Sequence, residues 1–568
     1  ACYNRIQSAI RIAAGLQEEH KYREQSPGLA VLLGALMLGA GFLFGDGVIS
    51  PAISVLSAAE GLKAASPMLA GAAVPFTIAV LALLFAVQHK GTGGIGWISG
   101  SILILWFAVI AALGVRQIAA HPEILHAFNP AYAFAFLQKA GMLNVLLTLG
   151  ALMLIVAGGE AMYADLGHFG ARPIRLGWFM LAFPALVSNY LGQGALMLGQ
   201  PPAEGGRLFY SMVPHGLLYP MVILATLATV IASQALIAGA FSLTSQAVAL
   251  GLLPRLRIVH THDAHAGQIY IPFVNWALFA GCVALVLFFG SSGSLAAAYG
   301  LTVSGVMVVT SIAMIPLGTR CWNWSPMGSG ALFGFFTLIN IMFFVASSLK
   351  FLEGGYIPLG IGLAVFIAMR TWRWGRKATF AAYTEKHSMT MKRLVEFHRD
   401  ETTYIERIAL LMTPKHLATL NDYAPALLQL LYDRYGILAR HLIFVEVAHP
   451  KVPYIHADRY RIKVFHKDRK SSIIAVTLQF GFMEEPNVEA LLGDMAKHHE
   501  IDLPVEENRW IVHVSMENLL PARNMSLAGR LRLRLFLLLR QISQPAHYFY
   551  GLGGNVQMSA EIMPVRVK

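Results

Sequence analysis

Charged residues are scarce in this chain. Aspartate, glutamate, lysine and arginine make up 13% of its 568 residues, about half the usual share for a soluble globular protein. Hydrophobic residues make up 56%, and the mean hydropathy is +0.57. A soluble fold of this size cannot bury so much apolar surface, because part of any fold stays exposed to solvent. The composition therefore excludes an ordinary soluble protein, a disordered chain and a collagen-like fibre, and it predicts a membrane protein.

Cysteine is also rare, and acidic residues are fewer than basic ones. Cys2, Cys282 and Cys321 have no spacing typical of a disulfide framework, a redox motif or a zinc site. Lysine and arginine number 43 against 31 aspartates and glutamates, which gives a net charge of +12. Such an excess is typical of cytoplasmic loops in membrane proteins, so we expect no nucleic-acid partner. No nucleophile–base set or phosphate loop stands out, which argues against an enzyme.

Long apolar runs fill residues 29–371. About 20 apolar residues cross a bilayer, and ten runs come near that length. They lie at 30–59, 73–88, 97–117, 142–164, 174–198, 215–248, 270–290, 294–316, 329–348 and 355–371. Lysine and arginine favour the loops on the side of both chain ends, which predicts cytoplasmic termini. We interpret residues 1–28 as a cytoplasmic leader and 29–371 as a transmembrane domain in the cell membrane.

The composition changes after residue 371. Residues 378–568 hold 20 of the 31 acidic residues, and short periodic segments replace the long apolar runs. We expect strands at 408–412, 441–447, 461–465, 473–480 and 510–514. We expect helices at 383–398, 416–435, 488–498 and 527–541. Residues 372–568 are therefore predicted to form a cytoplasmic α/β domain.

Acidic side chains are nearly absent from the apolar runs. Asp46 and Glu160 lie within runs, and Glu60 and Asp165 lie at run ends. A carboxyl group in hydrocarbon is costly and usually marks an ion or proton path. Burial favours its protonated form and a bound cation favours its charged form, so such a group can exchange a proton for a metal ion. This chemistry is typical of a cation-coupled carrier.

The neighbours of these carboxyl groups fit that chemistry. Pro51 lacks a backbone N–H, so a helix through Asp46 loses a hydrogen bond there. Gly158 and Gly159 directly precede Glu160, and Tyr163 follows it by one helical turn. Interrupted helices expose carbonyl oxygens near the membrane midplane, where transporters bind ions. Carboxylate, carbonyl and phenol oxygens suit an alkali or alkaline-earth cation better than a soft metal.

The same residues also allow structural roles. Asp46 and Glu160 can cap a helix or bond to a neighbouring residue, and Asp165 can cap a helix or anchor a nearby arginine. Tyr299, in an apolar segment, can anchor or pack at the interface as well as contact an ion. These alternatives remain open at the level of the residues alone.

Three other signals favour structural readings. The glycine-rich segment 91–96 and the histidines 260, 262 and 265 are interpreted as loops rather than phosphate or metal sites. The predicted helix 527–541 is basic. Its arginines favour a solvated face, with contact to anionic lipid as the alternative; they are Arg530, Arg532, Arg534 and Arg540.

The chain resembles the Kup (HAK/KT) potassium uptake transporters. The resemblance rests first on GDGVISPAISVLSAAEGL at 45–62 and GGEAMYADLGHFGARPIRLGWF at 158–179. Further matching segments are 189–198, 227–248, 267–276, 295–305, 354–359 and 481–488. It covers nearly the whole chain from about residue 28, including the C-terminal part.

The resemblance implies potassium uptake by K⁺/H⁺ symport, with K⁺ and H⁺ as substrates and no cofactor. It implies an α-helical transporter of the amino acid–polyamine–cation fold, with two inverted five-helix repeats. Asp46 and Glu160 match cation- and proton-pathway positions, and Tyr163 and Tyr299 match positions nearby. We expect K⁺ near Asp46, Glu160 and Tyr163. A homodimer fits such a carrier, and a small-molecule regulator fits its cytoplasmic domain; the sequence specifies neither.

The chain departs from the family pattern in three places. The GDIGTSPLY-like and NAGEGG-like motifs of the family's first two spans do not occur in these 568 residues. Ala157 stands where family members often have threonine, three residues before the glutamate. We therefore expect an N-terminally shortened transporter. The alternatives are a carrier of another cation or an amino acid, a non-transporting membrane sensor, and an inactive truncated product.

Overall fold

The structure is a computed structural model that describes most of residues 27–567. The described part excludes 91–95, 157, 159–170, 200–207, 262–267, 385–388, 401–403, 414–415, 449, 451, 453, 469–470, 482–483, 485, 499–500, 502–509, 523, 546–547, 549 and 553–555. The chain divides into two compact units. The first holds residues up to 250 and 267–369, and the second holds 251–266 and 370–568. Each unit is described by itself.

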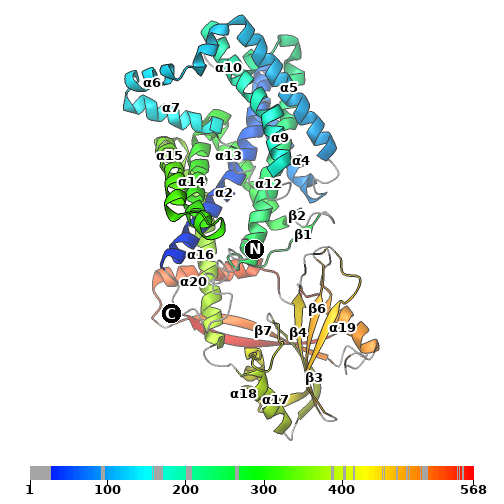
Figure 1. Cartoon of the computed structure of the whole chain (residues 1–568). Helices are drawn as coiled ribbons and strands as arrows, with labels where there is room; N and C mark the ends of the chain where they lie inside the picture. The colour runs from blue at the N-terminus through cyan, green and yellow to red at the C-terminus, as the bar shows by residue number, and fades with distance from the viewer. Residues whose placement is uncertain are drawn as a thin grey trace. The chain divides into compact units, whose positions relative to one another are not determined.

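The first unit is helical (Figure 1). Its helices are α2 (Pro27–Ala59), α3 (Gly61–Ala65), α4 (Ala73–Val87), α5 (Gly96–Ala120), α6 (Pro130–Lys139), α7 (Gly141–Val156), α9 (Ala171–Gly177), α10 (Phe183–Gly199), α11 (Leu208–Ser211), α12 (Leu218–Ala249), α13 (Pro272–Phe289), α14 (Ser292–Cys321), α15 (Pro326–Ser348) and the first part of α16 (Tyr356–Thr384). Short 3₁₀ turns lie between several of them, and a π-helical turn, Trp178–Ala182, joins α9 to α10. Two two-residue strands, β1 (Val259–His260) and β2 (Ile269–Tyr270), lie in the connection between α12 and α13.

Eight helices of the described part are long and apolar enough to cross a membrane. They correspond to eight of the ten predicted spans. The predicted span 142–164 is not among them, because α7 ends at Val156 and most of the following residues lie outside the described part. The predicted span 355–371 is not among them either. The apolar stretch of α16 ends at Met369, before Arg370, and is shorter than the length that usually crosses a bilayer. The chain is a multi-pass membrane protein.

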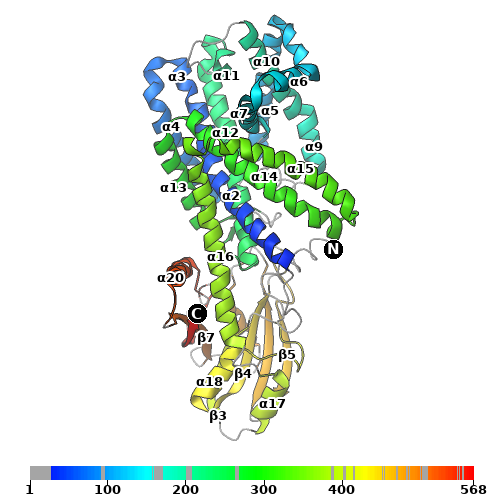
Figure 2. The ribbon, with the colours of Figure 1, turned by 90° about the vertical axis from the view of Figure 1, so that its left-hand side faces the viewer.

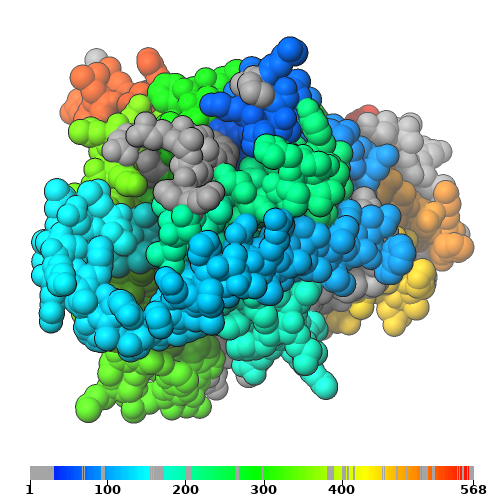
Figure 3. Space-filling view, turned by 90° about the horizontal axis from the view of Figure 1, so that it is seen from above, coloured from blue at the N-terminus to red at the C-terminus, as the bar shows by residue number. Residues whose placement is uncertain are grey.

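The outer helices expose large apolar side chains. Figure 3 looks down on the molecule and shows α5, α6 and α7, in blue to cyan, on the face turned to the viewer. Trp97 on α5, Phe134 on α6 and Met142 on α7 are among the most exposed apolar residues there. In water such a surface would drive aggregation. In a bilayer it is the expected lipid-facing surface.

Helix α2 is the centre of the first unit. It packs against α4, α12, α13 and α14, and both ribbon views show it among them (Figures 1 and 2). The backbone of Gly41 lies directly against the Gly362 carbonyl of α16, so a side chain at Gly41 would collide with it. The predicted weak point at Pro51 does not break α2, which stays helical to Ala59. Near this proline the Val48 carbonyl accepts a hydrogen bond from the Cys282 thiol of α13 (3.1 Å).

The second unit is a mixed α/β domain. Its strands are β3 (Tyr404–Met412), β4 (Leu438–Ala448), β5 (Tyr460–Lys467), β6 (Ser472–Gln479), β7 (Trp510–Pro521) and β8 (Gln557–Val567), in the order β5-β6-β4-β3-β7-β8. Only β5 runs antiparallel to its neighbour. The helices are α17 (Met391–Asp400), α18 (Ala426–Tyr435), α19 (Val488–Lys497) and α20 (Leu527–Ile542), together with the end of α16. Sheets of parallel strands are buried on both faces.

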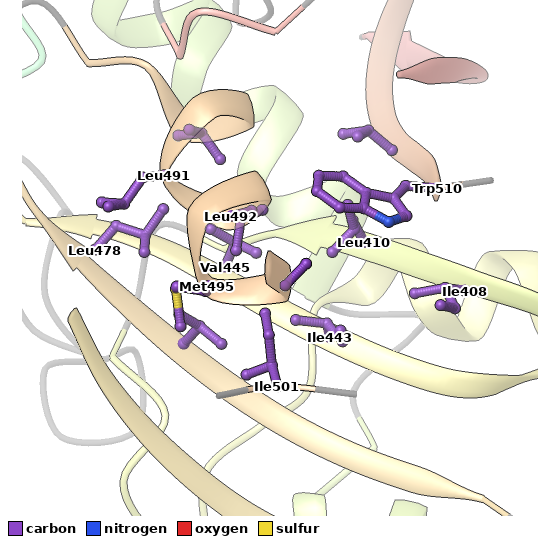
Figure 4. Close-up of a cluster of buried hydrophobic side chains, with 14 of the residues drawn as sticks. Ile408, Leu410, Ile443, Val445, Leu478, Leu491, Leu492, Met495, Ile501 and Trp510 are labelled. Carbon is purple, nitrogen blue, oxygen red and sulfur yellow. The ribbon is translucent and has the colours of Figure 1, made fainter. Parts of the chain in front are cut away.

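Alternate residues of the sheet build two cores. Figure 4 shows one of them, where Ile443, Val445 and Trp510 pack beneath α19. On the other face Phe444 and Leu411 pack with residues of α17 and α18. The five predicted strands are present. The sixth, β8, was not predicted, and the helix predicted for 416–435 begins only at Ala426, after Pro425.

Candidate functional site

Asp46 is fully buried near the middle of α2. Its Oδ1 accepts a hydrogen bond of 2.6 Å from the hydroxyl of Ser50, one helical turn further on. Ser50 is itself buried. A buried carboxyl group costs much less free energy when it is hydrogen-bonded. Asp46 and Ser50 therefore place three side-chain oxygen atoms among the apolar side chains that surround α2.

Four helices surround this part of α2. Gly45 faces the Thr302 side chain of α14 and the Pro358 carbonyl of α16. Gly47 faces Leu278 of α13 and Ala240 of α12. The two glycines beside Asp46 thus let neighbouring helices approach closely. Thr302 contributes its methyl group to this contact, because its hydroxyl donates to the Ala298 carbonyl of α14 (3.4 Å). The polar group supplied at this level is therefore the Pro358 carbonyl, a kind of ligand that hard cations prefer.

Tyr299 lies on α14, one turn before Thr302. Its side chain is half-buried. Residues three apart share a face of a helix, so Tyr299 lies on the same side of α14 as the residue that faces Gly45. The face of α14 that carries Tyr299 is therefore the face that packs against α2.

The second predicted carboxyl group lies outside the described residues. Glu160, Tyr163, Asp165 and Gly159 belong to the segment 159–170. Gly158 is described: it follows the end of α7, is exposed and has φ +110°. Few residues other than glycine adopt that conformation. Helix α7 ends at Val156, four residues before Glu160 in the sequence.

A second buried carboxyl group was not predicted to have a role. Glu60, just beyond the end of α2, is buried and accepts two hydrogen bonds from Ser292 at the start of α14. Its Oε1 accepts from the Ser292 backbone N–H (2.9 Å), and its Oε2 accepts from the Ser292 hydroxyl (2.6 Å). Close by, the Tyr210 hydroxyl donates to the Ala58 carbonyl (3.0 Å). The two bonds from Ser292 fix the end of α2 to α14, the helix that carries Tyr299, and the Tyr210 bond fixes it to α11.

The described residues contain no group of three or more histidine, cysteine, aspartate or glutamate side chains arranged to hold a metal ion. Of the three histidines in the loop after α12, only His260 is described. Potassium is bound mainly by neutral and singly charged oxygens, so a potassium site does not require a dense cluster of acidic ligands.

Comparison with known proteins places both units in one family. Residues 9–377 match the model described as "K+ potassium transporter integral membrane domain", and residues 407–559 match "K+ potassium transporter C-terminal domain". A "Probable potassium transport system protein Kup 1" of Geobacter sulfurreducens is 40% identical over 529 residues, which are 93% of this chain and 82% of that protein. A "Probable potassium transport system protein Kup" of Methylibium petroleiphilum is 45% identical over 458 residues, 80% of this chain and 71% of that protein. The chain belongs to the Kup family of potassium transporters.

Proposed function

We propose that this chain takes up potassium by K⁺/H⁺ symport, with Asp46 and Glu160 as the coupling groups. The observation that carries the proposal is the buried Asp46 carboxyl group and its hydrogen bond to Ser50. Such a group is stable either protonated or beside a cation. With two carboxyl groups in the proposed pathway, one can carry the proton while the other balances the charge of K⁺, so that both ions cross together. Membership of a potassium transporter family supports K⁺ as the cation.

In the proposed site K⁺ binds near Asp46, Glu160 and Tyr163. Tyr299 and backbone carbonyls complete the oxygen ligands, since potassium exchanges its water shell for several such dipoles. Gly158 and Gly159, with Pro51, supply the backbone freedom for opening and closing. Asp165 caps or anchors the cytoplasmic end of this pathway.

The architecture proposed for this function is an amino acid–polyamine–cation transporter fold with inverted repeats. Residues 29–371 form the transporter domain in the bacterial inner membrane, and 1–28 and 372–568 are cytoplasmic. The parallel strands of the second unit support a regulatory role, because such sheets bind small molecules at the carboxyl ends of their strands. A homodimer is the proposed assembly.

The proposal is tested by Rb⁺ uptake into proteoliposomes under an inward proton gradient. Asp46→Asn keeps the size and the acceptor oxygen for Ser50 but cannot be protonated or charged, so we expect it to abolish gradient-driven uptake. Glu160→Gln is expected to do the same. The matched control is Glu123→Gln, since Glu123 is an exposed acidic residue of the turn after α5.

Three results would overturn the proposal. Uptake with unchanged pH dependence in both amide variants would remove the coupling role. Specific Rb⁺ binding without net flux in the well-inserted parent chain would favour a sensor. Competition by amino acids or organic cations, together with indifference to Rb⁺, would favour another cargo.

A further inference from the structure

Helix α20 has two opposite faces of different character. Leu533 and Phe536 are buried against the end of α16, where Phe536 stacks on Trp372 with ring centroids 5.2 Å apart. Figures 1 and 2 both show α20 beside this part of α16. Leu527 and Leu531, on the other face, are 82% and 69% exposed.

The exposed apolar residues form a continuous stripe. Leu527, Leu531, Leu538 and Ile542 follow one another at intervals of four, seven and four residues, which keeps them on one side of a helix. Arg530 and Arg534 are also exposed and lie along one edge of this stripe. A helix with leucines and arginines on its outer face matches the pattern of helices that lie in the headgroup region of a membrane.

The helix carries positive charge only. Its 16 residues include four arginines and no acidic residue. Arg532 lies over the Trp374 ring at 4.7 Å and donates to the Arg370 carbonyl (3.1 Å). Burial lowers the pKa of Arg532, and the positive charge of Arg370 lowers it further. Arg370 and Arg532 therefore repel each other, and no acidic residue of α20 offsets the positive charge of the helix.

The position of α20 along the chain selects the source of an anionic partner. Trp372 lies three residues after Met369, the last residue of the apolar stretch of α16, in one uninterrupted helix. Basic residues that follow an apolar membrane segment directly in the sequence are typical contacts of anionic lipid headgroups. A second copy of the chain is a poorer partner, because its α20 carries the same positive charge.

We propose that α20 lies on the anionic surface of the bilayer, with its leucine stripe among the lipids and Arg530 and Arg534 on lipid phosphates. Each arginine near such a surface strengthens binding about five-fold, and salt screens the effect. The proposal does not depend on which ions the chain transports. It assigns the basic helix a lipid partner in place of the solvated face expected from its sequence.

The test uses the full chain in nanodiscs of phosphatidylcholine, with or without phosphatidylglycerol. An environment-sensitive fluorophore is placed at Leu531→Cys, and in a second variant at Leu527→Cys, after Cys2→Ser and Cys321→Ser. Cys282 is buried, and the parent without an introduced cysteine measures its labelling. The matched control site is Leu420→Cys, at an exposed position before α18.

We expect blue-shifted emission and quenching by spin-labelled lipid at 531 and 527, but not at 420, in discs with phosphatidylglycerol. Raised salt or the double substitution Arg530→Gln/Arg534→Gln should weaken the lipid dependence, the latter by about 25-fold from two arginines. Equal quenching at 531, 527 and 420 would overturn the proposal. Quenching that does not depend on phosphatidylglycerol would also overturn it. A blue shift that occurs without lipid quenching and increases with the number of chains per disc would instead assign this face to a second copy of the chain.

Discussion

The Glu60–Ser292 contact should be a major contributor to the stability of the first unit. Glu60→Ala removes two hydrogen bonds to a carboxyl group and leaves the Ser292 N–H without its acceptor at the first turn of α14. Hydrogen bonds to charged groups contribute about 1.5–3 kcal/mol each, and such losses are not fully additive. A carboxylate at a helix N-terminus gains further from the helix dipole. We expect the free energy of unfolding to fall by about 3 kcal/mol.

The partner substitutions should rank below that value. Ser292→Ala keeps the backbone bond and should cost about 1.5 kcal/mol. Glu60→Gln keeps one acceptor oxygen and should cost about 1 kcal/mol. For a unit of this size, 3 kcal/mol corresponds to a Tm lower by about 5 °C.

The assay follows a thiol-reactive dye in detergent during heating. Cys282 is fully buried on α13 and becomes accessible on unfolding, so it reports the first unit in a Cys2→Ser/Cys321→Ser background. A double-mutant cycle of Glu60→Ala and Ser292→Ala should give a coupling free energy of about 1 kcal/mol or more. A Tm within about 1 °C of the parent for Glu60→Ala, or strict additivity in the cycle, would refute the reasoning.

Three further predictions concern packing and pH. Gly114→Leu should prevent a monodisperse elution profile in size-exclusion chromatography, because a side chain there collides with the Ser188 carbonyl of α10, whereas Gly100→Leu on the same helix, with open space around it, should elute like the parent. Phe444→Ala should cost about 3–5 kcal/mol and speed hydrogen exchange in β4 and β6, since Phe444 is fully buried. Burial lowers the pKa of His513 although Glu561 acts in the opposite direction. The unfolded chain therefore binds the proton more tightly, and stability present above about pH 6.5 is lost as the pH falls below it. In His513→Asn the urea midpoint of the second unit should therefore change less with pH across that range.

The elements that depend on local pattern were predictable. Eight spans follow from apolar length alone, and β6 follows from the buried run Ile473–Val476 of a strand covered on both faces. Strand β8 was missed because Ser559 and Glu561 interrupt its apolar residues, although Glu561 is buried and accepts an ion pair from Arg434 (2.5 Å). The sequence pattern does not distinguish such a paired acid from an exposed one.

The site was predictable only in part, for the same reason. A buried carboxyl group at Asp46 follows from one acid in an apolar run, and the Ser50 bond is a local one-turn contact. The Glu60–Ser292 contact joins residues 232 positions apart, so only the packing of α2 on α14 reveals it. The close approach of Gly41 to Gly362 depends likewise on the tertiary fold.

The central claim is the coupling of potassium to protons through a buried carboxyl group. It is tested most directly by recording Rb⁺ uptake and internal acidification in the same proteoliposomes, for the parent chain and Asp46→Asn. The account predicts that Rb⁺ entry acidifies the interior in the parent and that both signals disappear in Asp46→Asn. Rb⁺ entry without acidification in the parent, or acidification retained with uptake in Asp46→Asn, would contradict it.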